Sequence, residues 1–311
     1  MIVLIRLIVL QSNCSKLKPN LKRHTMSIEN KVYQQVTDRI IEELEKGAIP
    51  WVKPWNATSS ADKNVITKNE YNGINRLILG MSGYTNSVWG SFKQWQELGG
   101  NVAKGEKGTM IVFYSPIVKE ALNPATGNNE QSMYHCLKSY YVFNVDQVEG
   151  IEIEKPTVSP RVFEPSIALD ERILKTGANI KHGGSQAFYS PSTDFIGMPD
   201  RYSFSDDNNY YATILHELTH WSGAKHRLDR TKGKRFADSA YAFEELVAEM
   251  GAAFLCQDYA ISGDLRHAGY IGNWLQCLKA DNKAIFNAAA LAQKAATYIN
   301  ELDAITNQAA A

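Results

Sequence analysis

The stretch YYATILHELTHWS, residues 210–222, decides how the second half of this 311-residue chain is interpreted. Apolar residues recur in it at helical spacing, and His216 and His220 stand four positions apart. Side chains at positions i and i+4 of an α-helix lie one above the other, so both imidazoles can reach one ion. The stretch therefore predicts a helix that presents two metal ligands on one face.

The acid between these histidines, Glu217, completes the pattern H-E-x-x-H. Its side chain is offset from that of His216 by about 100° around the helix, which lets the carboxylate act as a general base toward a water molecule without ligating the ion. We therefore predict His216 and His220 as metal ligands and Glu217 as a catalytic residue. The alternative, a pair of ordinary core or surface histidines, is weakened by the acids that follow in the chain.

A third ligand is expected from a second helix, because a catalytic zinc site uses three protein ligands and leaves the fourth position open. The run YAFEELVAE, residues 241–249, has a helical pattern and places Glu245 and Glu249 on one face. Two acids on a face that must also pack are costly to bury unless they meet a cation or a hydrogen-bond donor. We predict Glu245 as the third ligand, Glu249 as the acceptor that orients one ligand histidine, and Glu244 as an alternative on the solvated face.

Another histidine, His226, lies ten residues after His216, where extended zinc motifs carry a third histidine. It follows Gly223, however, within the basic run from Lys225 to Arg230, and we interpret that run as a surface loop. The cofactor expected at the site is Zn2+, with Mn2+ or Co2+ as ions that can take its place.

The composition excludes several classes of protein. Hydrophobic residues make up 44% of the chain and charged residues 21%, and no uninterrupted apolar run approaches the roughly 18 residues that span a bilayer. Lys plus Arg equals Asp plus Glu at 33 each, so no net charge draws the chain toward nucleic acid or a membrane. The cysteines are far apart and form no CxxC pair, which favours a cytoplasmic location. They are Cys14, Cys136, Cys256 and Cys277.

The first 25 residues differ from the rest of the chain. An apolar decapeptide, residues 1–10, precedes a basic stretch, and this order is the reverse of that in a signal peptide. Met26 then opens an ordinary amphipathic helix pattern. We expect residues 1–25 to be a disordered extension or the product of an upstream start codon.

Two domains of the α+β class are expected from the length and from the order of the patterns. Residues 26–150 indicate a small α+β domain, residues 151–164 are rich in Pro and Glu and indicate a linker, and residues 165–311 indicate a mainly helical domain. The expected helices are 28–46, 71–77, 91–98, 166–178, 210–222, 240–259 and 271–302, and the expected strands are 109–114, 139–145, 187–189 and 195–196.

The amino-terminal domain is a candidate for binding single-stranded nucleic acid. Between Ile28 and Gly150 there are 12 basic and 13 acidic residues, and this segment holds four of the six tryptophans. Aromatic stacking platforms with a few basic groups can bind single strands without bulk positive charge. The tryptophans are also explained as core residues, so the residues alone leave both interpretations open.

With these motifs the chain resembles the ArdC-type antirestriction proteins of conjugative plasmids, from Met26 to about residue 305. The segments that carry the resemblance are 47–56 with the core PWVKPW, 71–75, 89–99, 104–108, 211–223 with the core HELTHW, 241–249 and 268–274. The resemblance implies an N-terminal domain that binds single-stranded DNA and a C-terminal zincin-like metallopeptidase domain. His216 and His220 match the histidine ligands of the family, Glu217 its catalytic acid and Glu245 its glutamate ligand.

The partners implied are single-stranded DNA and an unknown protein substrate, with no membrane. One function is a zinc metallopeptidase that also binds and protects incoming plasmid DNA. The alternative is a pure DNA-binding shield whose zinc is structural, and a third is hydrolysis of something other than a peptide. The candidate DNA contacts lie in loops or at helix starts beside the aromatic residues. They are Lys53, Trp55, Tyr71, Asn72, Asn75, Arg76, Lys104 and Lys107.

Overall fold

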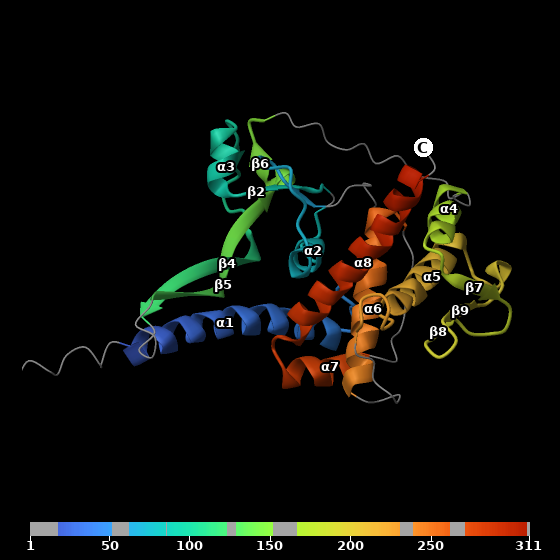
Figure 1. Ribbon diagram of the computed structural model, residues 1–311. Coiled ribbons are helices and arrows are strands. Elements are labelled where there is room, and N and C mark those ends of the chain that lie inside the picture. Colours follow the sequence, from blue (N-terminus) through green and yellow to red (C-terminus); the bar gives the residue numbers. More distant parts are fainter. Residues whose placement is uncertain are drawn as a thin grey trace, which may run out of the picture. The chain divides into compact units, whose positions relative to one another are not determined.

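The computed structural model describes residues 18–51, 62–84, 86–122, 129–151, 167–230, 239–261 and 271–309 (Figure 1). Helices and sheets both occur, which confirms the predicted α+β class. The chain forms two compact units: the first combines the described parts of 1–36 and 113–139, and the second those of 37–112 and 140–311. The predicted linker at 151–164 lies outside the described residues, apart from Ile151.

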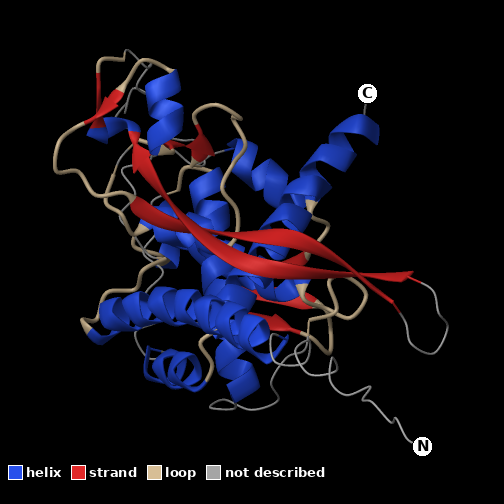
Figure 2. Ribbon diagram, turned by 90° about the vertical axis from the view of Figure 1, so that its left-hand side faces the viewer, coloured by secondary structure: helices blue, strands red, loops and turns tan. Residues whose placement is uncertain are grey.

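The first unit contains the start of one helix and part of a strand pair. The helix is α1 (Lys18–Glu45), and the strands are β4 (Thr109–Leu122) and β5 (Asn129–Asn144). The hydroxyl groups of Tyr33 on α1 and Tyr114 on β4 are hydrogen-bonded at 2.9 Å. Strands β4 and β5 are hydrogen-bonded neighbours and form the long twisted ribbon in Figure 2. Both strands extend beyond the apolar runs that predicted them.

Helix α1 begins at Lys18, eight residues before Met26, so residues 18–25 are helical rather than disordered as predicted. Pro19 falls in the first turn, where its missing N–H breaks no helical hydrogen bond. Extending an existing helix by a residue is also easier than starting one, because nucleation carries most of the cost. The amphipathic pattern after Met26 therefore marked the packed part of the helix rather than its beginning.

The amino-terminal part of the second unit is a small sheet with short helices around it. Its four strands are ordered β1-β2-β5-β4, with β1 parallel to β2 and β2 antiparallel to β5. A separate antiparallel pair joins β3 to β6. The short elements are β1 (Lys63–Asn64), α2 (Ile74–Gly80), β2 (Val88–Gly90), α3 (Phe92–Glu97), β3 (Asn101–Val102), η1 (Val145–Gln147) and β6 (Val148–Glu149).

Tryptophans form the core of this part of the unit. Trp89 and Trp95 are 1% and 0% exposed, and their indole N–H groups donate to Asp62 at 2.7 Å and to the carbonyl of Phe143 at 3.0 Å. Trp51 is 2% exposed, and its ring meets that of Trp274 on the carboxyl-terminal side of the unit, with centroids 5.2 Å apart. The core interpretation is therefore confirmed for these three tryptophans, and none of them is available as a stacking platform.

The carboxyl-terminal part of the second unit is mainly helical, as predicted. A three-stranded sheet ordered β7-β9-β8 contacts helix α5, and central strand β9 is parallel to β7 and antiparallel to β8. Strand β7 was not expected from the sequence. The elements are α4 (Ile167–Lys175), β7 (Asn179–His182), β8 (Phe188–Ser190), β9 (Phe195–Met198), η2 (Arg201–Ser203), α5 (Asp207–Ser222), α6 (Ser239–Asp258), α7 (Ile271–Ala280) and α8 (Ala284–Ala309).

The single long helix predicted at 271–302 is wrong, because two helices, α7 and α8, replace it. At the break, the Asp281 carboxylate accepts the backbone N–H of Lys283 at 2.9 Å. A local bond from an Asp side chain to the backbone competes with helical hydrogen bonding and favours a turn. Neither Gly nor Pro marks the break, so the apolar periodicity concealed it.

Helices α5, α6 and α8 pack closely, and small residues permit the approach. Gly251 on α6 faces Thr219 on α5, where a β-carbon on the glycine would lie 2.5 Å from the threonine methyl group. Helices α6 and α8 are also in contact, and both carry fully buried alanines such as Ala252 and Ala292. This close packing fixes the distance between side chains on α5 and α6. Within the described part of the chain, no helix has both the length and the apolar character needed to cross a membrane.

Candidate metal centre and nucleic-acid surface

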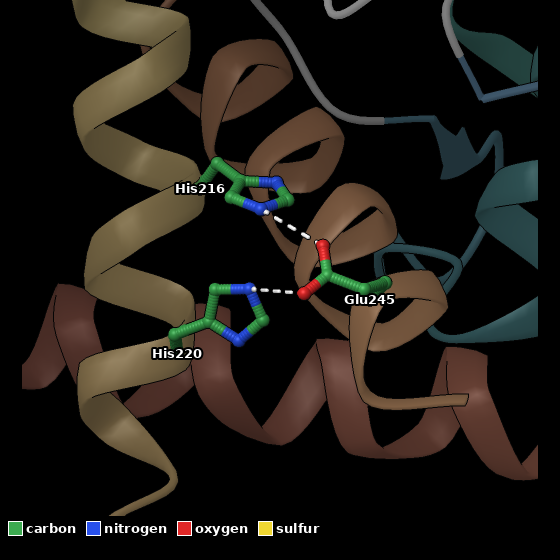
Figure 3. Close-up of side chains that lie close together, drawn as sticks. All are labelled: His216, His220 and Glu245. Atoms are coloured by element: carbon green, nitrogen blue, oxygen red, sulfur yellow. Dashed lines mark ion pairs between the residues drawn. The ribbon is translucent and has the colours of Figure 1, made fainter. Parts of the chain in front are cut away.

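Helix α5 holds the two predicted histidine ligands on one face. Asp206 caps the helix by accepting the backbone N–H of Asn209 at 2.8 Å. The ring centroids of His216 and His220 are 4.8 Å apart, and the two ring planes are nearly perpendicular. Both side chains extend from α5 toward α6 (Figure 3).

Glu245 reaches both histidines from α6. Its carboxylate oxygens lie 3.6 Å from Nε2 of His216 and 3.5 Å from Nε2 of His220. One candidate ligand atom from each residue lies within 4.8 Å of those of the other two. His216 and Glu245 are buried and His220 is nearly so. The structure thus brings together the three residues predicted as ligands (Figure 3).

Electrostatic interactions in this group favour the charged forms of His220 and Glu245. Burial lowers the pKa of His220, but its contacts with Glu244 and Glu245 outweigh burial and raise that pKa to about 9. Burial raises the pKa of Glu245, yet hydrogen bonds with the two histidines hold it well below its ordinary value. One carboxylate and two imidazoles in a buried site are a donor set that suits a divalent transition-metal ion. The residues present therefore fit the expected metal.

Two further predicted residues flank this group. Glu217 is 6% exposed and follows His216 directly on α5. Glu249 is 0% exposed, and its Oε1 lies 3.7 Å from Nδ1 of His216, on the side of the ring opposite Glu245. This position suits the orienting role predicted for Glu249. The roles of both glutamates remain predictions.

Glu244 is not on a solvated face, and that expectation is wrong. The residue is 4% exposed, and its Oε1 lies 3.4 Å from Nδ1 of His220. Its carboxylate also accepts a hydrogen bond from Nη2 of Arg230 at 2.9 Å. The expectation assumed a helix with one wet side, whereas every residue of α6 from 244 to 256 is buried. A helix buried all round gives no periodic signal for which acid faces the metal site.

His226 lies away from the candidate metal centre, in the turn that follows α5. Its side chain is 64% exposed, and its Nε2 lies 3.3 Å from the Asp194 carboxylate. This position agrees with the surface-loop interpretation of the basic run.

Two of the predicted DNA contacts make hydrogen bonds within the protein: Arg76 is buried, and Asn75 is half-buried. Arg76 is 4% exposed, and its Nη2 donates to the Asp258 carboxylate at 2.7 Å and to the carbonyl of Phe254 at 3.0 Å. The Asn75 amide donates to the carbonyl of Val112 at 2.8 Å and accepts the N–H of the same residue at 2.9 Å. Polar residues at a helix start serve internal hydrogen bonds as readily as ligands, and the sequence pattern does not distinguish the two.

The remaining candidates differ in exposure. Asn72, Lys104 and Lys107 are exposed, whereas Tyr71 is half-buried and its hydroxyl accepts a hydrogen bond from Asn64 at 3.2 Å. Outside the described residues lie Lys53 and Trp55.

An aromatic row not predicted from the sequence lies beside residues 104–108, here called the lysine turn; the row is formed by Phe92, Tyr141 and Phe143. Phe92 and Tyr141 are 50% and 56% exposed, and the rings of Phe92 and Phe143 meet edge to face with centroids 6.2 Å apart. Gly108, which ends the lysine turn, packs so closely that a β-carbon there would lie 2.9 Å from Cβ of Tyr141. The available signal was the alternation of aromatic residues at 141 and 143, which places both rings on one face of β5.

A helix with H-E-x-x-H whose histidines meet a glutamate from a second helix defines the class of zincin-like metallopeptidase domains. The family model described as a zincin-like metallopeptidase matches residues 168–291. A second model, described as the N-terminal domain of anti-restriction factor ArdC, matches residues 30–143. The chain belongs to the ArdC family of antirestriction proteins.

Solved structures and curated proteins agree with this assignment. The metal-free structure of antirestriction protein ArdC from plasmid R388 is 40% identical, with a TM-score of 0.75, and the match covers 88% of this chain and 97% of that one. For the Mn(II)-bound structure of the same protein, the identity is 37%, the TM-score 0.71 and the coverage 88% and 98%.

Two curated relatives differ in length. The uncharacterized protein y4eC of Sinorhizobium fredii is 39% identical over an alignment of 282 residues, and the match covers 86% of this chain and 91% of that protein. DNA primase TraC of Escherichia coli is 34% identical over 292 residues, a match to 88% of this chain that covers 27% of the primase. The ArdC-like region is therefore a minor part of the primase.

Proposed function

We propose that this chain is a DNA-binding antirestriction protein with a metal-dependent peptidase site, and that it protects incoming single-stranded plasmid DNA in the cytoplasm. The observation that carries the proposal is the convergence of His216, His220 and Glu245 beside Glu217. Membership of the ArdC family supports the antirestriction role. The buried free thiol of Cys256 suits a reducing compartment.

The proposed peptidase chemistry divides among the residues of the candidate metal centre. His216, His220 and Glu245 would hold one divalent cation, Zn2+ or Mn2+, and the bound ion would supply Lewis acidity toward the carbonyl of the peptide bond. Glu217 takes a proton from the attacking water and delivers it to the leaving amine. Glu249, whose Oε1 lies 3.7 Å from Nδ1 of His216, orients that ring toward Glu245.

The proposed DNA surface joins the aromatic row to the lysine turn. The rings of Phe92 and Tyr141 are about half exposed. Lys104 and Lys107 are exposed in the adjoining turn. Exposed rings stack on bases of any sequence, and nearby cations attract the phosphates. This arrangement supports binding of single-stranded DNA by a segment whose basic and acidic residues nearly balance.

A second candidate function is a DNA-binding shield in which the metal is only structural. The aromatic row favours it, because a surface that coats single strands can block a nuclease without any cleavage. Against it stands Glu217, since a purely structural site is closed by four protein ligands and has no use for a buried acid beside them.

Glu217→Gln separates the two candidate functions, because it preserves the shape of the side chain and removes the base. We expect peptide or casein cleavage to fall at least about a hundredfold while metal and DNA affinity stay near wild type. Glu171→Gln, on the exposed side of α4, is the matched control and should change nothing. Cleavage by Glu217→Gln at the wild-type rate would exclude the peptidase proposal. Full plasmid protection without cleavage would favour the shield.

A further inference from the structure

Arg230 makes an unusual set of contacts at the end of the turn that follows α5. The residue is 8% exposed, and its guanidinium donates to the carbonyl of Thr219, to Oγ of Ser222 at 2.8 Å, and to the Glu244 carboxylate at 2.9 and 3.3 Å. Two of these acceptors belong to the last turn of α5, and the third belongs to α6. Arg230 therefore joins the two helices that carry the candidate metal ligands.

The Glu244 carboxylate has a second partner, the ring of His220. Its Oε1 lies 3.4 Å from Nδ1, while the other ring nitrogen, Nε2, faces Glu245 at 3.5 Å. An imidazole has two distinct nitrogens, and the hydrogen bond at one decides which is left to bind a metal. A chain of contacts thus runs from Arg230 through Glu244 to the side of His220 that faces away from the proposed ion.

Gly223 has no side chain, and this leaves room for the guanidinium of Arg230. A β-carbon at this position would lie 2.8 Å from Nη2 of Arg230. The backbone of Gly223 has φ −79°, which any residue adopts, so the glycine is not there for its conformational freedom. The N–H of Arg230 also donates to the carbonyl of Gly223 at 3.0 Å, which closes the turn on itself. The absence of a side chain at Gly223 and this backbone hydrogen bond together allow the Arg230 side chain to reach the end of α5.

Charge explains why an arginine is needed there. A buried carboxylate without a cation is strongly unfavourable, and removing one partner of a buried pair leaves the other uncompensated. Arg230 supplies the compensating charge together with a planar fork of donors, which a lysine does not reproduce. With its charge balanced and its position fixed, Glu244 is able to stay within reach of Nδ1 of His220 in a buried site.

We propose that Arg230 is a positioning residue for the metal centre: it holds Glu244 against Nδ1 of His220, so that Nε2 is presented to the ion. This inference rests on the proposed metal site. It assigns a function to the turn after the H-E-x-x-H helix, and it makes affinity for the ion depend on a residue that is not a ligand.

The test compares two arginines of the same turn in the full-length protein. Arg227 is the control, because it lies over the ring of Trp221 with its Cζ 3.9 Å from the centroid, donates to the Trp221 carbonyl at 2.7 Å, and does not contact Glu244. Titration of metal-free protein with Mn2+ in a calorimeter should give a roughly 10- to 100-fold weaker affinity for Arg230→Met. Arg227→Met should stay within about threefold of wild type, although both variants lose internal contacts and should melt earlier.

Two further variants keep the test decisive if Arg230→Met unfolds. Gly223→Ala leaves every polar group in place but displaces the guanidinium, and it should weaken Mn2+ binding in the same direction. Arg230→Met combined with Glu244→Gln removes the buried charge yet keeps an acceptor for Nδ1 of His220, and it should recover most of the lost affinity. Circular dichroism checks that each variant is folded before titration.

The outcomes separate the inference from the proposed function. No Mn2+ or Zn2+ binding by the wild type would overturn both. Wild-type binding with undiminished affinity in Arg230→Met and Gly223→Ala would overturn the inference alone. An equal loss in Arg227→Met, or a double variant no better than Arg230→Met, would reduce Arg230 to general support of the turn and would also overturn it.

Discussion

His220 stands between two carboxylates, and this determines how the metal-free site responds to pH. Glu244 lies at its Nδ1 and Glu245 at its Nε2, and together they raise its pKa to about 9. In an unfolded chain the pKa of a histidine is about 6.5. The folded metal-free protein therefore holds a proton there that the unfolded chain releases at lower pH.

Two consequences of this proton are testable. In metal-free protein, the stabilising contribution of protonated His220 should be complete below about pH 6.5 and should disappear as the pH rises through about 9. Because an ion must displace the same proton, Mn2+ affinity should rise by up to about tenfold per pH unit over that window. Calorimetry in buffers of different ionisation enthalpy counts the protons released. An affinity that does not change between pH 6.5 and 9 would contradict the assignment.

The aromatic row predicts which residues carry DNA affinity. Tyr141→Ala removes one exposed ring and should weaken binding of an oligothymidine by about 5- to 150-fold, equivalent to about 1–3 kcal/mol of stacking. Tyr202→Ala is the matched control, because that ring is 99% exposed but lies on η2, in the carboxyl-terminal part of the chain. Fluorescence anisotropy of a labelled oligothymidine measures the affinity of both variants. Equal affinities for Tyr141→Ala and wild type would remove the row from the DNA surface.

The convergence of His216, His220 and Glu245 was predictable because it follows from local geometry. The i, i+4 spacing of His216 and His220 is a property of any helix, and Glu245 shares one face of a helical run with Glu249. The pairing of Arg230 with Glu244 was not predictable in this way, since residues 231–238 separate the turn from α6 and no periodicity links them. The internal role of Arg76 was missed for the same reason.

At the scale of elements, the metal centre depends on the approach of α5 to α6. Thr219 and Gly251 are in contact where a β-carbon would not fit, and Thr219 lies one residue before His220. The predicted helices 210–222 and 240–259 agree closely with α5 and α6, which the structure places at Asp207–Ser222 and Ser239–Asp258. The distance between the helices was not predictable, since it depends on small residues that meet only after folding.

Gly251→Ala tests this close approach. The added methyl group would lie 2.5 Å from the Thr219 side chain, so the helices must separate, and overpacking of this kind costs about 1–3 kcal/mol. Mn2+ affinity should fall as well, because the ligands are divided between the two helices. Gly272→Ala on α7 is the control: its β-carbon meets nothing within 4 Å, and a gain in helix propensity should leave stability unchanged or raise it by up to about 1 kcal/mol. Urea denaturation that ranks the two variants in the opposite order would refute the packing argument.

At the scale of the whole molecule, parts of the two segments matched by the family models are joined inside the second compact unit. Arg76 on α2 lies in the ArdC N-terminal match, and Asp258 at the end of α6 lies in the metallopeptidase match. The Arg76 guanidinium also lies 4.6 Å from the ring centroid of Phe254. A cation at the last turn of α6 interacts favourably with its carbonyls, so this contact also supports the helix that carries Glu245.

Breaking this connection should destabilise the whole unit. Arg76→Met leaves Asp258 without its cation and should lower the free energy of unfolding by at least about 2 kcal/mol. Lys279→Met breaks the exposed pair with Glu45, whose side chains are about half exposed, and should cost no more than about 1 kcal/mol. Chemical denaturation followed by tryptophan fluorescence measures the free energy of unfolding of both variants. Equal losses would mean that the Arg76 contact does not hold the unit together.

The central claim is that His216, His220 and Glu245 bind one divalent ion, and anomalous X-ray diffraction tests it directly. Crystals of the wild-type protein grown with Mn2+ or Zn2+ should show, in data collected at the absorption edge of that metal, one strong anomalous peak. We expect that peak between Nε2 of His216, Nε2 of His220 and the carboxylate of Glu245. A crystal that contains the ion but shows its anomalous peak elsewhere, or no peak at these three residues, would contradict the account.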